Sequence, residues 1–190
     1  MGKEDFITTA SGVHFTPFSP QTGQIHADDI AHALSHLCRA NGHCRHFYSV
    51  AQHSVNCAKE AQAREMSRRV QFACLLHDAS EAYLSDVTRP VKRNIPTYLE
   101  FEQVLQDKIF ETFGIGDLTH EELEQVKSVD DDMLWYEFER LMPEPLGCNP
   151  PQIISSPNLE QVDFQTVKTA FLGMLSDLRN QIDSLADIKP

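Results

Sequence analysis

The sequence predicts a mostly α-helical single domain with a small β-hairpin near its N-terminus. Apolar residues recur at helical spacings of three and four from about residue 30 to the end of the chain. Residues 6–27 instead combine short β-prone runs with turn formers, which is typical of a hairpin. The 190 residues fit one domain, at most two small ones, and suffice to bury a substantial core.

The first 29 residues form an N-terminal extension, with the hairpin turn expected around Ser11 and Gly12. The first helix begins within "DDIAHALSHLCRANG". Asp28 or Asp29 is expected to cap it, and Gly42 to end it.

Further helices are expected at residues 48–64 and 67–85, followed by a loop with two prolines. Two capping boxes, Thr97 with Glu100 and Thr119 with Glu122, predict the starts of two more helices. These run to Gly114 and to about Leu141. A proline-rich connector at 143–157 then leads to a C-terminal helix at 158–185, so the main helical core spans 30–142.

The formal net charge is −12, with 41% apolar and 23% charged residues. This charge argues against a duplex nucleic-acid partner, which would favour a basic surface. No apolar run approaches the roughly 18 residues that span a membrane, so no membrane partner is expected. The cysteines are odd in number and show no paired spacing, which indicates buried thiols in a reducing compartment, the cytoplasm. They stand at positions 38, 44, 57, 74 and 148.

The stretch "ACLLHDASEAYLSDVTRPVK", residues 73–92, places ionisable side chains in an apolar helix. His77 and Asp78 are adjacent, and Glu81 follows His77 by one helical turn on the same face. Burying such groups costs free energy unless they are paired or bind a metal. An alternative for any lone His-Asp pair is a core histidine with exposed acids.

Two other helices add candidates for the same site. On the helix ending near Leu141, Asp130 shares a face with the apolar residues, whereas Asp131 aligns with Lys127 as a surface pair. His53 lies on an apolar face of the helix at 48–64. Two imidazoles and two carboxylates facing inward suit one divalent cation, Mn, Fe, Co, Ni, Zn or Mg, with coordination positions left open to water.

The order His53, His77-Asp78, Asp130 resembles the HD-domain superfamily of metal-dependent phosphohydrolases. The stretches "SVAQHSVNCA", "LLHDASEAYLSDVTRPVK" and "VKSVDDDMLWYEFERLM" are similar to the small bacterial HD-domain 5′-deoxynucleotidases and related nucleotide phosphohydrolases. The resemblance covers roughly residues 30–142.

The resemblance implies roles for eight residues. The metal ligands would be His53, His77, Asp78 and Asp130. Glu81 would be the catalytic carboxylate, acting through water. The substrate-binding residues would be Arg39 for phosphate, Asp86 for a sugar hydroxyl and Lys92 in the matching loop. Arg89 and Arg93 are interpreted as solvated.

Two departures leave the substrate open. Ala40 stands where the deoxynucleotidases carry a bulky aromatic residue used in sugar selection, and residues 6–29 have no counterpart. The expected function is hydrolysis of a nucleotide phosphate ester or anhydride, either a (deoxy)nucleoside 5′-monophosphate or a nucleoside triphosphate. Alternatives are an HD-type phosphodiesterase, a guanosine-tetraphosphate hydrolase, or a non-catalytic HD module that binds a ligand. A homodimer is one alternative for the oligomeric state.

Overall fold

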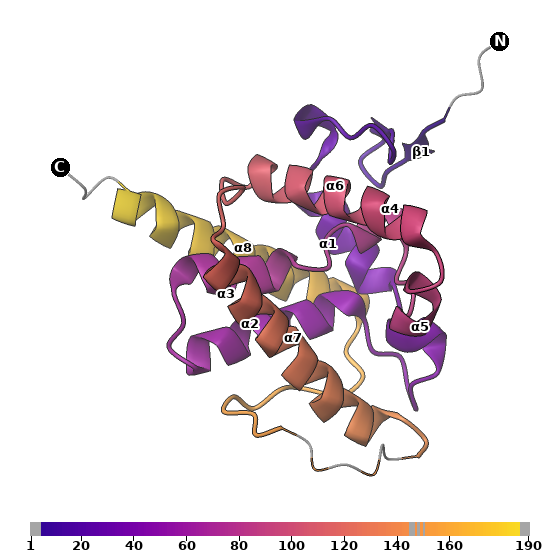
Figure 1. The fold of residues 1–190 in the computed structure, drawn as a ribbon, viewed down its shortest axis with the longest axis vertical. Coiled ribbons are helices and arrows are strands. Elements are labelled where there is room, and N and C mark those ends of the chain that lie inside the picture. The colour runs from indigo at the N-terminus through magenta and orange to yellow at the C-terminus, as the bar shows by residue number, and fades with distance from the viewer. Residues whose placement is uncertain (1–4, 145–146, 148, 150, 187–190) are drawn as a thin grey trace.

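The computed structural model describes residues 5–144, 147, 149 and 151–186, and most of its regular structure is helical (Figure 1). Two short antiparallel strands, β1 (Ile7–Thr8) and β2 (His14–Phe15), form the hairpin. The helices are α1 (Ala27–His36), α2 (Val50–Ala63), α3 (Arg68–Leu76), α4 (Glu81–Leu84), α5 (Arg89–Lys92), α6 (Pro96–Thr112), α7 (His120–Leu141) and α8 (Phe164–Ala186), with 3₁₀ turns η1 (Thr22–Gln24) and η2 (Arg39–Gly42). The predicted fold class, a helical domain with an N-terminal hairpin, is confirmed.

The centre of the molecule is built by α2 and α3, which pack against each other, with α7 and α8 lying against both (Figure 1). Helix α1 packs on α2, α4 and α8. The core is filled by large apolar side chains that are fully buried, among them Phe15, Ile30, Leu34, Phe72, Leu75, Leu76, Ile109, Met133 and Phe171. This packing brings together α2, the end of α3 and α7, the three segments that carry His53, His77 and Asp130.

The hairpin is fixed to the core through one aromatic contact and one carboxylate. Phe15 is fully buried and stacks on Tyr83 of α4, with ring centroids 3.9 Å apart. Asp29 of α1 accepts hydrogen bonds from the backbone N–H and the hydroxyl of Ser11, both at 2.7 Å, and from the Thr9 hydroxyl at 2.8 Å. The N-terminal extension therefore rests on α1 and on the short helix that begins with Glu81.

We expect Asp29→Asn to destabilise the protein by about 1–3 kcal/mol at neutral pH, because a buried charged acceptor is lost. Burial opposes ionisation, but the hydrogen bonds from Ser11 and Thr9 hold the pKa of Asp29 below its usual value. A carboxyl with a lowered folded-state pKa stabilises the fold above its unfolded pKa of about 3.9, and this stability is lost as the pH falls through the folded-state pKa. Thermal unfolding of both proteins should therefore converge at acidic pH.

The control is Asp28→Asn, since the Asp28 side chain is 74% exposed. This change should leave the melting temperature nearly unchanged at every pH. Equal losses in both variants would show that general charge, rather than the Asp29 contacts, carries the effect.

The predicted caps of the first helix were wrong. Helix α1 has His26 at its N-cap, and neither Asp28 nor Asp29 caps it. It ends at His36 and not at Gly42, because the chain then becomes extended and pairs Cys38 with Ser49. The Val50 N–H donates to the Leu37 carbonyl, which holds this reversal in place.

Two other helix starts differ from the sequence prediction, and one agrees. Helix α6 begins at Pro96, a residue suited to the first helical position, and Thr97 does not cap it. Helix α8 begins at Phe164 rather than 158, where Asp163 accepts a hydrogen bond from the Thr166 N–H at 3.0 Å. The capping box of Thr119 and Glu122 at the start of α7 is confirmed.

The helix predicted at 67–85 is interrupted beside the candidate site. Helix α3 ends at Leu76, residues 77–80 form turns, and α4 starts at Glu81. Gln106 of α6 stabilises this break, since its side chain donates to the Leu76 carbonyl at 2.8 Å and accepts from the Ser80 N–H at 3.1 Å. His77 and Glu81 are therefore not successive positions on one helical face.

The connector is described in part. Its second half crosses α2, where the buried Glu60 carboxylate accepts hydrogen bonds from the N–H groups of Ile154 and Ser155 and from the Ser155 hydroxyl. Among the predicted thiols, Cys57 and Cys74 are buried and Cys38 and Cys44 are half-buried, and all four are free. Cys148 lies outside the described residues.

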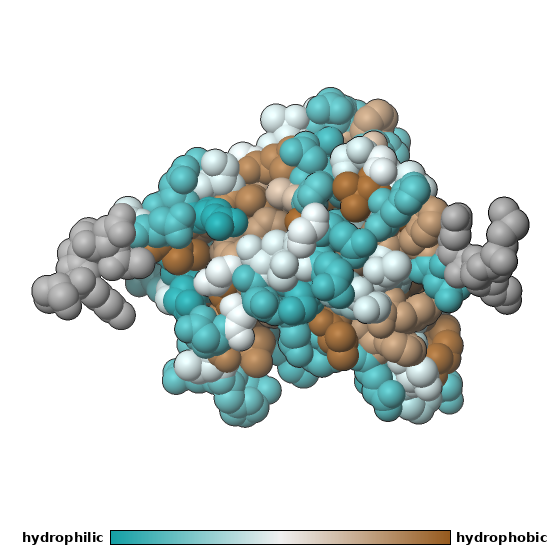
Figure 2. All heavy atoms as spheres, turned by 90° about the horizontal axis from the view of Figure 1, so that it is seen from above, coloured by the Kyte–Doolittle hydropathy of each residue, from teal (hydrophilic) through white to brown (hydrophobic). Residues whose placement is uncertain are grey.

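The face seen in Figure 2 carries hydrophobic side chains in several separate groups between hydrophilic ones. Across the described residues, none of the helices combines the length and the hydropathy needed to cross a membrane.

Candidate metal centre and its pocket

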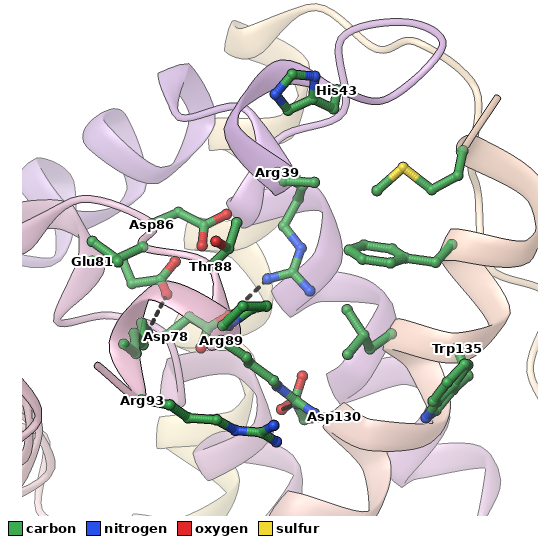
Figure 3. A pocket seen from close by; sticks show the side chains of 17 residues that line it. Arg39, His43, Asp78, Glu81, Asp86, Thr88, Arg89, Arg93, Asp130 and Trp135 are labelled. Carbon is green, nitrogen blue, oxygen red and sulfur yellow. Dashed lines mark hydrogen bonds and ion pairs between the residues drawn. The ribbon is translucent and has the colours of Figure 1, made fainter. Parts of the chain in front are cut away.

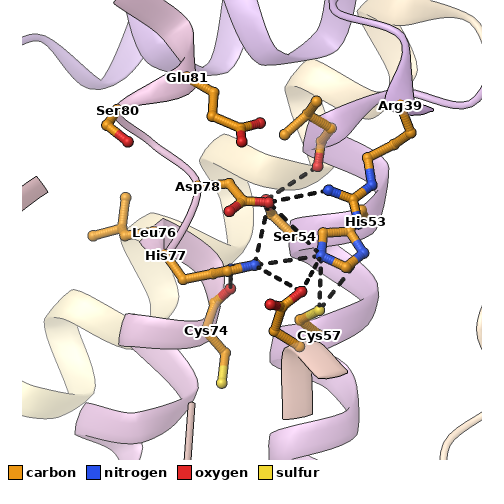
Figure 4. Close-up of polar contacts among 12 residues, drawn as sticks. Arg39, His53, Ser54, Cys57, Cys74, Leu76, His77, Asp78, Ser80 and Glu81 are labelled. Carbon is orange, nitrogen blue, oxygen red and sulfur yellow. Dashed lines mark hydrogen bonds and ion pairs between the residues drawn. The ribbon is translucent and has the colours of Figure 1, made fainter. Parts of the chain in front are cut away.

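Two histidines, one on α2 and one in the turn after α3, point their Nε2 atoms at each other across a 3.3 Å gap (Figure 4). His53, on α2, is fully buried, and its Nδ1 lies 2.9 Å from both carboxylate oxygens of Glu137. His77 follows the last residue of α3, and its Nδ1 lies 2.8 Å from the Cys74 carbonyl. Both contacts favour the proton on Nδ1, which leaves each Nε2 free to bind a metal.

Two carboxylates complete this cluster. An Asp130 oxygen lies 3.3 Å from His53 Nε2 and 3.6 Å from His77 Nε2. An Asp78 oxygen lies 3.3 Å from His77 Nε2 and 3.8 Å from His53 Nε2. The structure thus brings together all four residues that the sequence offered as ligands, and Asp130 rather than its neighbours faces them.

The spacing of these four atoms fits one divalent ion. Nitrogen and oxygen donors bound at about 2.0–2.2 Å to a common ion lie roughly 3 to 3.6 Å apart, depending on the coordination geometry. Four of the separations that involve a histidine Nε2 are 3.3–3.6 Å, and the fifth, from His53 Nε2 to the Asp78 oxygen, is slightly longer at 3.8 Å. Two carboxylates also match the charge of a divalent cation, and mixed nitrogen and oxygen donors suit the borderline and hard ions.

The cluster is strongly polarised. Burial lowers the pKa of His77, but the Asp78 and Asp130 carboxylates outweigh this effect and raise that pKa well above its usual range. Burial would raise the pKa of Asp130, but its contacts with His53 and His77 hold it well below the usual value. The carboxylates therefore favour positive charge at the histidine Nε2 atoms, and a divalent ion bound there would supply that charge and displace protons.

The cluster opens into a pocket of about 780 Å³ (Figure 3). Asp78 and Asp130 line it together with Glu81, the first residue of α4. Glu81 is buried, and one carboxylate oxygen accepts from Lys92 Nζ at 3.1 Å. Within the described part of the chain, its other oxygen is buried without a hydrogen-bond partner. Burial and the charges of Asp78 and Asp86 raise the pKa of Glu81 well above its ordinary value, although Lys92 opposes them.

The predicted substrate-binding residues all line this pocket. Arg39, in η2, is buried and donates from Nη1 to Asp78 at 3.3 Å. Lys92 bridges Glu81 and Glu102, the latter at 2.6 Å. Asp86 lies across the pocket from Trp135 in the view of Figure 3.

Arg89, which was interpreted as solvated, is 45% exposed and also forms ion pairs at the pocket. Its guanidinium donates to Asp130 at 2.7 Å and to Asp131 at 2.6 Å. Asp130 therefore presents one oxygen to the histidines and the other to Arg89. Asp131 also forms the predicted surface pair with Lys127.

Residues 35–143 match the family described as the HD domain, which is more than half of the chain. This chain belongs to the HD domain family. HD domains bind a divalent metal ion and are generally metal-dependent hydrolases. The match establishes the superfamily that the motifs indicated, and the narrower resemblance to 5′-deoxynucleotidases stays a prediction.

Two curated relatives were found. Over 110 residues the chain is 41% identical to the uncharacterized protein YfdR of Escherichia coli K12, covering 58% of this chain and 59% of YfdR. Over 111 residues it is 36% identical to the uncharacterized protein RCAP_rcc00048 of Rhodobacter capsulatus, covering 55% of this chain and 56% of that protein. The chain thus spans less than two thirds of the relatives it matches, and neither name describes an activity.

This HD domain also contains a thiol that the sequence did not suggest as a ligand. Cys57, one turn after His53 on α2, lies 3.4 Å from His53 Nε2, and His53, Cys57 and His77 form a group that could hold a metal ion. Burial and the nearby Asp130 and Glu137 charges raise the pKa of the Cys57 thiol well above its usual value. A thiolate is the binding form, so this environment favours the carboxylates over sulfur.

Sequence reasoning missed Glu137 and Tyr48. Glu137 is fully buried on α7, seven residues after Asp130, and accepts a 2.6 Å hydrogen bond from the Tyr48 hydroxyl besides contacting His53. The signal was present, because an acid on the apolar face of a helix needs a partner. Its partners come from the loop before α2 and from α2, so they could not be paired with it along the sequence.

We expect Glu137→Ala to weaken metal affinity about 10–100-fold, because residues that orient a ligating histidine typically contribute this much. Tyr48→Phe should have a smaller effect, since it leaves the Glu137 carboxylate in place and removes only the hydroxyl, which donates to Glu137 and accepts from Asn56. Titration of the metal-free protein with Mn²⁺ or Co²⁺ measures both.

The control is Glu124→Ala, an exposed acid on the same helix. If Glu137→Ala remains folded by circular dichroism and binds metal as tightly as this control, Glu137 does not orient His53.

Proposed function

We propose that this HD domain hydrolyses a phosphate ester or anhydride of a nucleotide, a (deoxy)nucleoside 5′-monophosphate or a nucleoside triphosphate, with a divalent metal. One observation carries the proposal. The pocket that contains the candidate ligands Asp78 and Asp130 is also lined by Arg39, Arg89, Lys92 and Arg93. In a chain of net charge −12, basic groups gathered around a metal cluster favour an anionic ligand such as phosphate.

His53, His77, Asp78 and Asp130 would hold the ion. When bound, the ion would supply a water of lowered pKa and would offset negative charge at the phosphoryl group. The residues around it must then bind phosphate, exclude bulk water and handle one proton.

Glu81 is the residue best suited to transfer that proton. It lies beside Asp78 in the chain turn, is 3% exposed, and keeps one buried oxygen without a partner in the described structure. Its raised pKa brings a carboxyl nearer to neutral pH, where a general acid or base is most effective. Glu81 would therefore accept a proton from the attacking water or donate one to the leaving oxygen.

Arg39 and Lys92 are suited to the phosphate. Arg39 presents a planar guanidinium from a buried position, and its Nε atom is among the described buried atoms that lack a hydrogen-bond partner. Arginine binds phosphate in a bidentate manner, and lysine supplies a point charge. Burial lowers the pKa of Lys92, but Glu81 and Glu102 raise it above its usual value, so it stays cationic.

Ala40 bears on the sugar. It lies in the pocket wall, and its backbone is in the left-handed region at φ 52°. The deoxynucleotidases that the chain resembles carry an aromatic side chain here that is used in sugar selection, and the methyl group of Ala40 would leave more space for a sugar bound at this wall. We therefore expect ribonucleotides to be accepted as well as deoxyribonucleotides.

The test is phosphate release from a panel of ribo- and deoxyribonucleoside mono- and triphosphates with Mn²⁺, Co²⁺, Mg²⁺ and Zn²⁺. Guanosine tetraphosphate and bis-p-nitrophenyl phosphate are included for the two alternative hydrolases, and His77→Ala is the control for a contaminating phosphatase. Metal-dependent release from at least one nucleotide, absent in His77→Ala, supports the proposal. Release only from the diester or the tetraphosphate would replace it, and binding without release would indicate a ligand-binding module.

A further inference from the structure

The pocket has two chemically different walls. One wall carries charged groups from η2 and the segment of α4 and α5, among them Arg39, Glu81 and Lys92. The other wall is apolar and comes from α7, with Leu134, Trp135, Phe138 and Met142 at its end. In Figure 3, Trp135 lies on the side of the pocket opposite Glu81 and Asp86.

Helix α7 presents this wall in addition to its core face. Val126, Val129 and Met133 are buried in the core cluster, as expected for an amphipathic helix. Leu134, Trp135 and Phe138 are not part of that cluster but line the pocket. Trp135 is 44% exposed. The apolar wall is therefore not needed to fill the core, and no described part of the chain covers it.

The position of this wall relative to the cluster limits what could cover it. Trp135 lies five residues after Asp130, and Phe138 lies eight residues after Asp130. These two side chains therefore start about 7.5 and 12 Å further along the helix axis than Asp130. This interval is on the scale of a nucleoside monophosphate, measured from its phosphate to its base. A ligand that contacts both walls must carry an anionic group at one end and a flat apolar group at the other.

We infer that Trp135 and Phe138 form a stacking wall for the nucleobase of a nucleotide whose phosphate lies at the His53–Asp130 cluster. This inference rests on the proposed function and adds the base subsite to it. Stacking on an aromatic side chain tolerates every base, because each base has a π face. The site should therefore discriminate weakly between bases and strongly against phosphates that lack one.

Trp135 is the only tryptophan of the chain, so its fluorescence reports on this wall directly. The 190-residue protein, metal-free and metal-loaded, is titrated with adenosine 5′-monophosphate, with ribose 5-phosphate and with an alkyl phosphate. We expect the nucleotide to quench the fluorescence and ribose 5-phosphate to leave it nearly unchanged.

Calorimetric affinities of variants complete the test. Trp135→Leu should weaken binding of the nucleotide roughly 5- to 150-fold, the range for loss of one stacked base, and leave binding of ribose 5-phosphate unchanged. Trp135→Phe should restore most of the affinity. Leu123→Ala, which changes an exposed apolar residue elsewhere on α7, should have no effect.

The inference is overturned if ribose 5-phosphate or the alkyl phosphate binds as tightly as the nucleotide, or if Trp135→Leu weakens all three ligands equally. If those compounds also release phosphate with metal, the protein is a phosphohydrolase that has no base subsite. Absence of both binding and release with every compound would instead overturn the proposed function as well.

Discussion

Glu81→Gln is expected to keep its bound metal and to lose about 10²- to 10⁴-fold in kcat, the usual contribution of a positioned general acid or base. Glutamine can still accept a hydrogen bond from Lys92, so the loss would come from the missing proton transfer rather than from repacking. Metal content by elemental analysis and phosphate release on the best nucleotide are measured on the same samples.

The matched control is Glu102→Gln, since Glu102 is the other carboxylate that accepts a hydrogen bond from Lys92. It should reduce kcat less than 10-fold, an order of magnitude below the general acid–base range. If Glu81→Gln loses its metal, the carboxylate is a ligand. If it retains both metal and full activity, another group handles the proton.

Asp130→Ala is expected to reduce metal affinity by more than the roughly 100-fold seen for residues that merely orient ligands, because a charged donor of the cluster is removed. Asp131→Ala should change it little, since Asp131 pairs with Arg89 and Lys127 at the surface. Mn²⁺ or Co²⁺ titration of each metal-free protein measures the difference.

Cys57→Ala decides between the two donor sets that share His53 and His77. It should retain metal, because the buried thiol is protonated and the carboxylates are already charged. The opposite result, metal lost in Cys57→Ala and retained in Asp130→Ala, would place the ion on His53, Cys57 and His77.

The candidate ligands were predictable because helical phase acts locally. The apolar stripe of α7 selects Asp130 over Asp131 before any contact is known, and the capping box at Thr119 fixes where that helix begins. The family motif then adds His53 and the pair His77-Asp78. In the structure these four side chains converge as the pattern indicated.

What failed depends on contacts between distant residues. No glycine or proline stands between Leu76 and Ser85, so a continuous helix was expected there. The break is stabilised by Gln106, thirty residues further along the chain. The support of His53 by Glu137 and the pairing of Arg89 with Asp130 likewise require the packing of α2, α5 and α7.

The N-terminal extension shows the same limit. Its hairpin was predictable from turn residues, but its attachment was not. Asp29 resembles a helix cap in sequence, yet its carboxylate accepts hydrogen bonds from the Thr9 and Ser11 hydroxyls of the hairpin. The Asp29 carboxylate could cap α1 or bind the hairpin, and in the structure it binds the hairpin.

The most direct test is a titration of metal-stripped protein with one divalent ion, in which bound ion and phosphate release from the best nucleotide are measured in the same samples. We expect no release without the ion, a rise in proportion to bound ion, and a plateau at one ion per chain. Release that survives complete stripping would contradict the account, as would full binding of the ion without release from any nucleotide.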